Sequence, residues 1–295
     1  MTLAELLTAL APVSLDGLAF PRRLLGAFRR KSITFANGLT DETTIVFWFQ
    51  SKTFTIDLRL PDGAETALLD RQGWVGDTSW DAAAQQLSWT INRSYQPRNQ
   101  WPEPATLNFI GNSVIEFAPS GAYVEDWRQQ STSGPLLGLR LLSLFDESTG
   151  QTHAMDGGLI IASNHAAYAQ SRLPAVDAAL NDSGDLAKAL EDRRVTEQDI
   201  ASYEVSVASN GDTVTHSTQP ERVGQPILAG DFGIEPDGSV ALAQTIDGSP
   251  CRLRFVVDLN IPDFVFDNST PSTAEALVWA ECEKAHLMRH AWIAR

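Results

Sequence analysis

Apolar and polar residues alternate over short stretches throughout the first half of the chain. The segment Thr53-Phe-Thr-Ile-Asp-Leu-Arg-Leu60 alternates strictly, and Pro61-Asp-Gly63 follows it as a turn. The preceding segment 43–49 is rich in β-branched and aromatic residues, which favour strands. The two segments therefore predict a β-hairpin. Further strands are expected over 71–78, 86–93, 113–118, 123–129, 137–145 and 158–163, and residues 166–172 could form one more.

These closely spaced strands predict a closed antiparallel barrel. An open meander of this length would expose an edge strand with unpaired backbone groups, and closure removes that edge. Leucines at positions 3, 6, 7 and 10 have the spacing of a short amphipathic helix before the strands. We therefore expect residues 1–172 to form a β-barrel with an N-terminal helix.

Helical periodicity appears after residue 172. Pro174–Leu180 and Asp185–Asp192 are rich in Ala and Leu, and Asp182 or Ser183 could cap the second helix. Residues 173–200 are therefore expected to form a helical linker.

Strand patterns return after this linker. Asn210-Gly211 is a strong hairpin signal, and Pro271 with Ser272 marks the start of a closing helix over 273–293. Residues 201–295 are therefore expected to form a second, smaller β domain, either a barrel or a meander, with a C-terminal helix. Its strands are expected over 203–208, 213–216, 226–229, 240–244 and 252–259.

Composition and charge exclude several classes of protein. The chain has 295 residues, of which 43% are hydrophobic and 20% charged, as in globular proteins with a substantial core. A net charge of −15 argues against nucleic acid and against an anionic membrane surface as partners. The N-terminus is too acidic for a signal peptide, and no apolar stretch is long enough for a membrane helix. We therefore expect an acidic, cytoplasmic protein, with its oligomeric state left open.

Charged residues within apolar strands are the main candidates for chemistry. Burying such charges is costly unless they are paired, so they either face water or line a polar cavity. The basic cluster Arg29-Arg30-Lys31 is expected to form a solvated face, with an anion contact as the alternative.

The strand faces allow a sharper hypothesis, in which several charged and aromatic side chains converge inside the first barrel. Apolar walls with a few fixed polar groups are typical of small-molecule sites. There an arginine could bind a carboxylate or enolate, and a glutamate could act as acid or base. The catalytic candidates are Glu125, Arg59 and Tyr123, and the ligand-binding candidates are Trp48, Trp89, Arg93, Trp127 and Arg140.

Other catalytic templates are missing from the sequence. It contains neither a phosphate-binding glycine loop, nor a dinucleotide fingerprint, nor a Gly-x-Ser-x-Gly motif. His286 and His290 have the spacing of a zinc-protease pair, but Leu287 stands where that motif needs Glu. We therefore expect neither a cofactor nor a metal.

Six short motifs, kept in order over residues 30 to 172, resemble a known group of proteins. They are Thr43-Thr-Ile-Val-Phe-Trp-Phe-Gln50, Phe54-Thr-Ile-Asp-Leu-Arg-Leu-Pro61, Gly73-Trp-Val-Gly76, Leu87-Ser-Trp-Thr-Ile-Asn92, Ile115-Glu-Phe117 and Tyr123-Val-Glu-Asp-Trp127. The group comprises uncharacterised bacterial and fungal proteins of lipocalin (calycin)-like fold, whose fungal members hold two successive β-barrels. The resemblance implies a mainly β, lipocalin-like fold with a cavity, and it implies no established activity.

Three functions remain open at this point. The first is binding of a small, partly apolar, anionic molecule in the first barrel. The second is a cofactor-independent lyase, isomerase or hydratase that uses Arg, Glu and Tyr in that cavity. The third is a protein-interaction scaffold. A filled barrel would favour the scaffold, paired Arg and Glu with a perturbed acid would favour the enzyme, and an aromatic cavity would favour the binder.

Overall fold

The first nine strands of the chain form a sheet that closes into a barrel. The computed structural model describes residues 1–98, 103–246 and 248–291. The sheet is antiparallel throughout, and β1 pairs with β9 to close an eight-stranded barrel, with the short β2 attached to β1. The strands are β1 (Gly26–Phe35), β2 (Thr40–Asp41), β3 (Ile45–Gln50), β4 (Phe54–Leu60), β5 (Gln72–Asp81), β6 (Gln86–Ser94), β7 (Ala105–Ile110), β8 (Ser113–Phe117) and β9 (Tyr123–Gln129).

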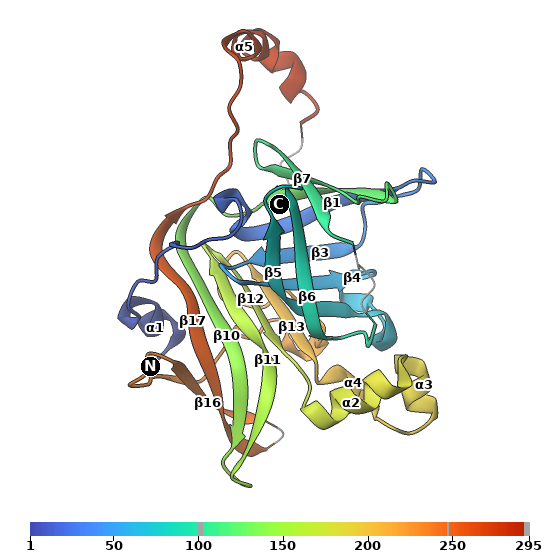
Figure 1. Ribbon diagram of the computed structural model, residues 1–295, viewed down its shortest axis with the longest axis vertical. Coiled ribbons are helices and arrows are strands. Elements are labelled where there is room, and N and C mark those ends of the chain that lie inside the picture. The colour runs from blue at the N-terminus through green and yellow to red at the C-terminus, as the bar shows by residue number, and fades with distance from the viewer. Residues whose placement is uncertain (99–102, 247, 292–295) are drawn as a thin grey trace.

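The remaining strands form a second antiparallel sheet, which contains the three longest strands (Figure 1). Within the described ranges no strand pairing joins β14 to β15, so this sheet remains open. In sheet order its strands are β14 (His216–Ser217), β13 (Glu204–Ser209), β12 (His165–Gln170), β11 (Gln151–Ala162), β10 (Ser133–Asp146), β17 (Ser249–Val265), β16 (Val240–Ile246) and β15 (Asp231–Ile234).

The prediction of a mainly β, lipocalin-like chain is confirmed by this closed meander followed by a second sheet. The assignment of β10, β11 and β12 to the first barrel is wrong, because all three pair within the second sheet. β1 closes the first barrel instead. The basic residues of β1 resemble a solvated face, so the sequence pattern predicted no strand there, nor at β7 and β15. In place of the strand expected over 226–229, Pro226 forms an isolated β-bridge with Thr213.

Helices occupy the expected regions of the chain. Gly184 ends α2 in a left-handed conformation with φ of 70°, so the next helix begins after it. Asp185, and neither Asp182 nor Ser183, therefore caps α3 by accepting a hydrogen bond from the Lys188 N–H. The helices are α1 (Leu3–Ala9), α2 (Pro174–Ser183), α3 (Leu186–Glu191), α4 (Glu197–Ala201) and α5 (Ala274–Met288), with single 3₁₀ turns η1 (Arg22–Leu24), η2 (Gly63–Glu65), η3 (Leu68–Asp70) and η4 (Pro220–Arg222).

The C-terminal helix α5 stands away from both sheets (Figure 1). Its large apolar residues Leu277, Val278 and Trp279 are all exposed. Residues 292 and 293 of the helix expected over 273–293 lie outside the described residues. No described helix has both the length and the apolar content needed to cross a bilayer.

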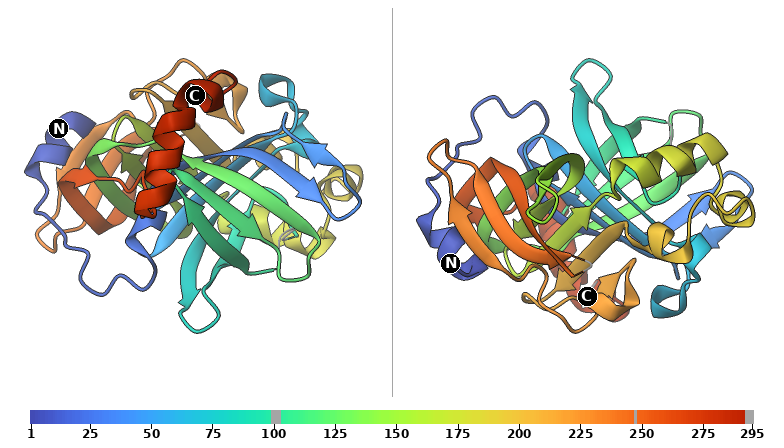
Figure 2. Two further views of the ribbon diagram at one scale, coloured as in Figure 1. Left: turned by 90° about the horizontal axis from the view of Figure 1, so that it is seen from above. Right: turned by 90° about the horizontal axis from the view of Figure 1, so that it is seen from below.

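The first barrel and the second sheet lie side by side (Figure 2) and share one apolar core. Both faces of β4 are buried. Its outward residue Phe54 packs against the second sheet, where a Cβ on Gly158 would lie 2.8 Å from the Phe54 ring. Similarly, a Cβ on Gly73 of β5 would lie 2.7 Å from Val205 of β13. The barrel therefore turns apolar residues outward toward the second sheet.

A second apolar core fills one end of the second sheet. Phe255 of β17, Leu159 of β11 and Val240 of β16 belong to it, together with Leu6 of α1 and Leu10, which directly follows that helix. The N-terminal helix thus completes this core, which leaves the other end of the sheet open.

We expect Gly158→Ala to lower the free energy of unfolding by about 1–3 kcal/mol, because the new methyl group would meet both the Leu139 carbonyl oxygen and the Phe54 ring. Gly233→Ala in β15 is the matched control, since open space surrounds its Cβ position. Urea denaturation would measure both variants. Equal stability of Gly158→Ala and the parent chain would contradict the close packing of the two sheets.

Candidate functional site

The interior of the first barrel brings together six of the eight predicted site residues. The odd-numbered residues of β4 and β9 point inward, as strand alternation requires. These side chains surround a cavity of only about 20 Å³, which is about the space of one water molecule. The predicted residues that line it are Trp48, Arg59, Trp89, Tyr123, Glu125 and Trp127, and the other lining residues are Asp57, Trp74, Glu103 and Glu116.

Aromatic packing explains why this cavity is small. The Trp48 ring lies 5.7 Å from Trp127 and 6.0 Å from Trp89, in edge-to-face arrangements. Trp74 lies 5.7 Å from Trp89, and Phe28 stacks on Trp48 at 4.7 Å. Aromatic pairs at these distances stabilise a core. The tryptophans therefore fill the barrel.

Ion pairs bind the charged residues of the barrel to one another. The Arg59 Nε lies 2.8 Å from the Asp57 carboxylate, two residues away on the same face. Arg30 lies 2.8 Å from both Glu125 and Asp41. The prediction that Arg30 belongs to a solvated face is wrong, because the residue is only 6% exposed. Arg30 lies two residues after Phe28 and therefore shares one face of a strand with this apolar residue. That spacing is the sequence feature that could have predicted its burial.

Glu116 is the perturbed acid of this interior and was not among the site residues predicted from the sequence. Its carboxylate accepts a hydrogen bond of 3.0 Å from the Trp127 indole N–H, which also donates to Glu125 at 3.2 Å. Burial, together with the negative charge of Glu125, raises the pKa of Glu116 to about 8. Burial also raises the pKa of Tyr123, whose hydroxyl lies 3.5 Å from Glu116. Glu116 is therefore protonated at neutral pH.

Arg93 and Arg140 lie outside this interior, so their predicted place in the barrel is wrong. Arg93 bonds to the Ala154 carbonyl at 3.0 Å and to Ser171 at 3.2 Å. Arg140 lies 2.8 Å from Asp156 of β11. Both arginines thus lie between the barrel and the second sheet.

Strand pairing explains both misplacements. In the β5–β6 register, Val75 pairs with Arg93 whereas Asp77 pairs with Thr90, so β6 carries one extra residue between these pairs. That bulge turns Arg93 to the other face. Arg140 belongs to β10, which is part of the second sheet, and its side chain points toward the outside of the barrel.

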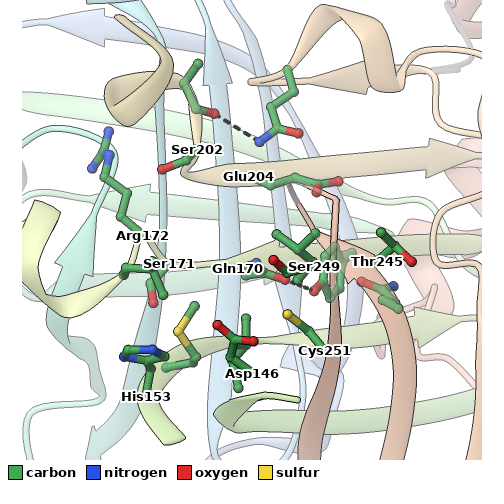
Figure 3. A pocket seen from close by; sticks show the side chains of 18 of the residues that line it. Asp146, His153, Gln170, Ser171, Arg172, Ser202, Glu204, Thr245, Ser249 and Cys251 are labelled. Atoms are coloured by element: carbon green, nitrogen blue, oxygen red, sulfur yellow. Dashed lines mark hydrogen bonds between the residues drawn. The ribbon is translucent and has the colours of Figure 1, made fainter. Parts of the chain in front are cut away.

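The large cavity of the molecule lies at the open end of the second sheet (Figure 3). Its volume is about 1130 Å³, and apolar and polar groups share its walls. The strands contribute Leu144, Met155, Tyr168, Ile246 and Cys251 to its apolar wall. The polar side chains in the wall include Asp146, His153, Gln170, Arg172, Ser202, Glu204, Glu221, Arg222 and Thr245.

Segments far apart in the sequence build this cavity, from the ends of β10, β11, β12, β16 and β17 and from α4 and η4. Hydrogen bonds hold its wall in place: the Tyr168 hydroxyl donates to Gln170 at 2.6 Å, and the Gln219 amide donates to the Ala201 carbonyl at 2.9 Å. This site was not predicted from the sequence, because strand patterns reveal the two faces of each strand and not which strands meet.

The described residues offer no metal site, since no three His, Cys, Asp or Glu side chains lie close enough together to hold an ion. His286 and His290 lie at the exposed end of α5.

Comparisons with known proteins add little to this geometry. No protein-family model and no curated protein matches the chain. A crystal structure of a lipocalin-like protein from Bacteroides uniformis matches at 14% identity, covering 36% of this chain and 98% of its own, with a TM-score of 0.29. The lipocalin-like description of this chain therefore rests on its own closed eight-stranded meander.

We expect Arg59→Ala to lower the free energy of unfolding by about 3–5 kcal/mol, because it would leave Asp57 buried without its ion pair. Arg128→Ala is the matched control in the same barrel, since its pair with Asp126 is partly exposed. Arg128→Ala should lower the free energy of unfolding by about 1 kcal/mol or less. Chemical denaturation would compare them, and equal losses would argue against a buried ionic interior.

We expect Glu116 to contribute a loss of stability as the pH rises from about 4.5 to about 8, the interval between its ordinary and its folded pKa. In that interval the folded state keeps a proton that the unfolded chain has released, so the loss can reach about 1.4 kcal/mol per pH unit. Glu116→Gln should remove this component and stabilise the protein above pH 8.

Urea titrations of the parent, Glu116→Gln and Glu42→Gln would test this expectation, with Glu42 as an exposed control. Glu42→Gln should follow the parent at every pH. If Glu116→Gln also follows the parent, Glu116 does not carry a raised pKa.

Proposed function

We propose that this chain binds a small molecule in the large cavity at the open end of the second sheet. The observation that carries the proposal is the cavity itself, of about 1130 Å³ with mixed apolar and polar walls. Small-molecule sites are typically concave, largely apolar and furnished with a few fixed polar groups. The lipocalin-like fold is consistent with such binding.

The ligand is placed in the second sheet because the first barrel has no room for it. That interior leaves a cavity of about 20 Å³, and its arginines are already paired with carboxylates. A lyase, isomerase or hydratase there would need substrate atoms within hydrogen-bond reach of Glu116 or Glu125. The raised pKa of Glu116 alone therefore does not support an enzyme. In this proposal the filled first barrel supports the second sheet. The cytoplasmic location expected from the sequence stays a prediction.

We expect the protein to bind the neutral dye Nile red saturably, with a rise in fluorescence, and Thr245→Trp to weaken this binding at least about tenfold. Thr245 is an exposed strand residue in the cavity wall, so the indole would occupy ligand space without disturbing a core. Thr152→Trp is the matched control, at an exposed position of β11 outside the cavity wall.

Native mass spectrometry of the purified protein would add a search for a bound small molecule. Binding that Thr245→Trp and Thr152→Trp leave equally unchanged would place the ligand elsewhere. Absence of dye binding, together with absence of any retained molecule, would overturn the proposal.

A further inference from the structure

We propose that the ligand of the second-sheet cavity is cationic, with an apolar body and an ammonium or similar positively charged group. The inference rests on the proposed function and specifies the class of ligand. It differs from the anionic ligand expected from the sequence, which depended on arginines inside the first barrel.

The cavity wall carries more negative than positive charge. Its carboxylates are Asp146, Asp199, Glu204 and Glu221, and its guanidinium groups are Arg172 and Arg222. The whole chain also has a net charge of −15, which raises the local concentration of cations around it.

Arg172 cannot serve as an anion-binding group, because backbone carbonyls already occupy its guanidinium. Its Nε donates to the Ile200 carbonyl at 3.1 Å, one terminal nitrogen to Ser94 at 3.1 Å, and the other to Tyr95 at 3.0 Å. The residue is only 2% exposed. Recognition of a carboxylate or phosphate by arginine needs a free pair of N–H groups, so this side chain holds the wall together.

Arg222 is similarly committed to the protein. Its Nε lies 2.7 Å from the Glu204 carboxylate, and one terminal nitrogen donates to the Pro226 carbonyl at 3.1 Å and to the Ile227 carbonyl at 2.8 Å. These contacts occupy the Nε and one terminal nitrogen of Arg222, and the Glu204 carboxylate already balances its charge, which weakens its attraction for an anionic ligand.

Asp146 offers the clearest contact for a cation. It ends β10 beside His153 and Cys251 in the lower part of Figure 3, where its side chain lines the cavity. Its Oδ1 accepts hydrogen bonds from the backbone N–H groups of Ser148 at 2.8 Å and Thr149 at 3.3 Å. The Ser148 hydrogen bond lowers the pKa of Asp146, so the carboxylate is ionised at neutral pH and its other oxygen can accept from a ligand.

The apolar wall sets the other requirement on the ligand. Leu144, Met155, Leu228 and Ile246 lie in the same cavity as Asp146. A molecule that contacts both parts of the wall needs an apolar body attached to the charged group. An amphiphilic amine has this combination.

Three dansyl probes of similar size would test the inference. Dansylcadaverine carries an ammonium, dansyl-aminohexanoate a carboxylate and hexyl dansylamide no charge. Fluorescence titrations at about 0.15 M salt limit the effect of distant charges. We expect dansylcadaverine to bind about fivefold or more tightly than dansyl-aminohexanoate, as one or two partly exposed charge contacts would produce.

The double variant Asp146→Asn, Glu221→Gln should bring the two affinities within about twofold of each other, since it removes two negative charges from the wall. Asn can keep the turn hydrogen bonds that Asp146 accepts. Asp263→Asn removes a charge at an exposed position near the other end of β17 and should leave the preference unchanged.

The outcomes separate the two proposals. Equal or tighter binding of the carboxylate probe, or a preference that the double variant leaves unchanged, would overturn the cationic ligand while cavity binding stands. Failure of all three probes and of Nile red, together with the absence of any retained molecule in native mass spectrometry, would instead overturn the proposed function.

Discussion

The burial of both faces of β4 is the constraint on which the rest of the structure depends. Phe54, Ile56 and Leu58 pack outward into the core shared with the second sheet, and this leaves Asp57 and Arg59 on the inside of the barrel. A barrel that stood alone in water would favour polar residues on its outer face and apolar residues inside. The second sheet is therefore what makes an apolar outer wall favourable here, because it removes that wall from water.

The polar interior follows from this arrangement. Charges enclosed in a barrel must be paired, and Arg30 with Glu125 and Arg59 with Asp57 meet that requirement. Neither of these two ion pairs includes Glu116, which is neutral because it keeps its proton. Tryptophan side chains occupy the remaining space. A barrel filled in this way supports its neighbour and leaves little room for a guest.

The same arrangement frees the opposite face of the second sheet. Residues such as Ile160 and Ala167 contact the barrel side, whereas Leu159 and Tyr168 point into the curve of the sheet. Helix α1 covers one end of that curve, and the other end opens as the large cavity. The arginines of that cavity hold backbone segments in place, and Glu204 and Asp199 accept from Arg222 and Thr196, which leaves Asp146 and Glu221 as its more accessible charged groups.

The sequence by itself determined most strands, the helical linker and the alternation that separates Phe54 from Asp57, because side-chain direction in a strand has a local period of two. It also placed Arg59, Tyr123, Glu125 and three tryptophans on faces that meet. Only the tertiary structure decided which face of β4 is enclosed, since that depends on the partner sheet. A single extra residue in β6 redirected Arg93, and pairing with β17 placed Arg140 in the second sheet. The large cavity required strands that are distant in the chain to lie side by side, and strand pairing is a non-local choice that no short pattern records.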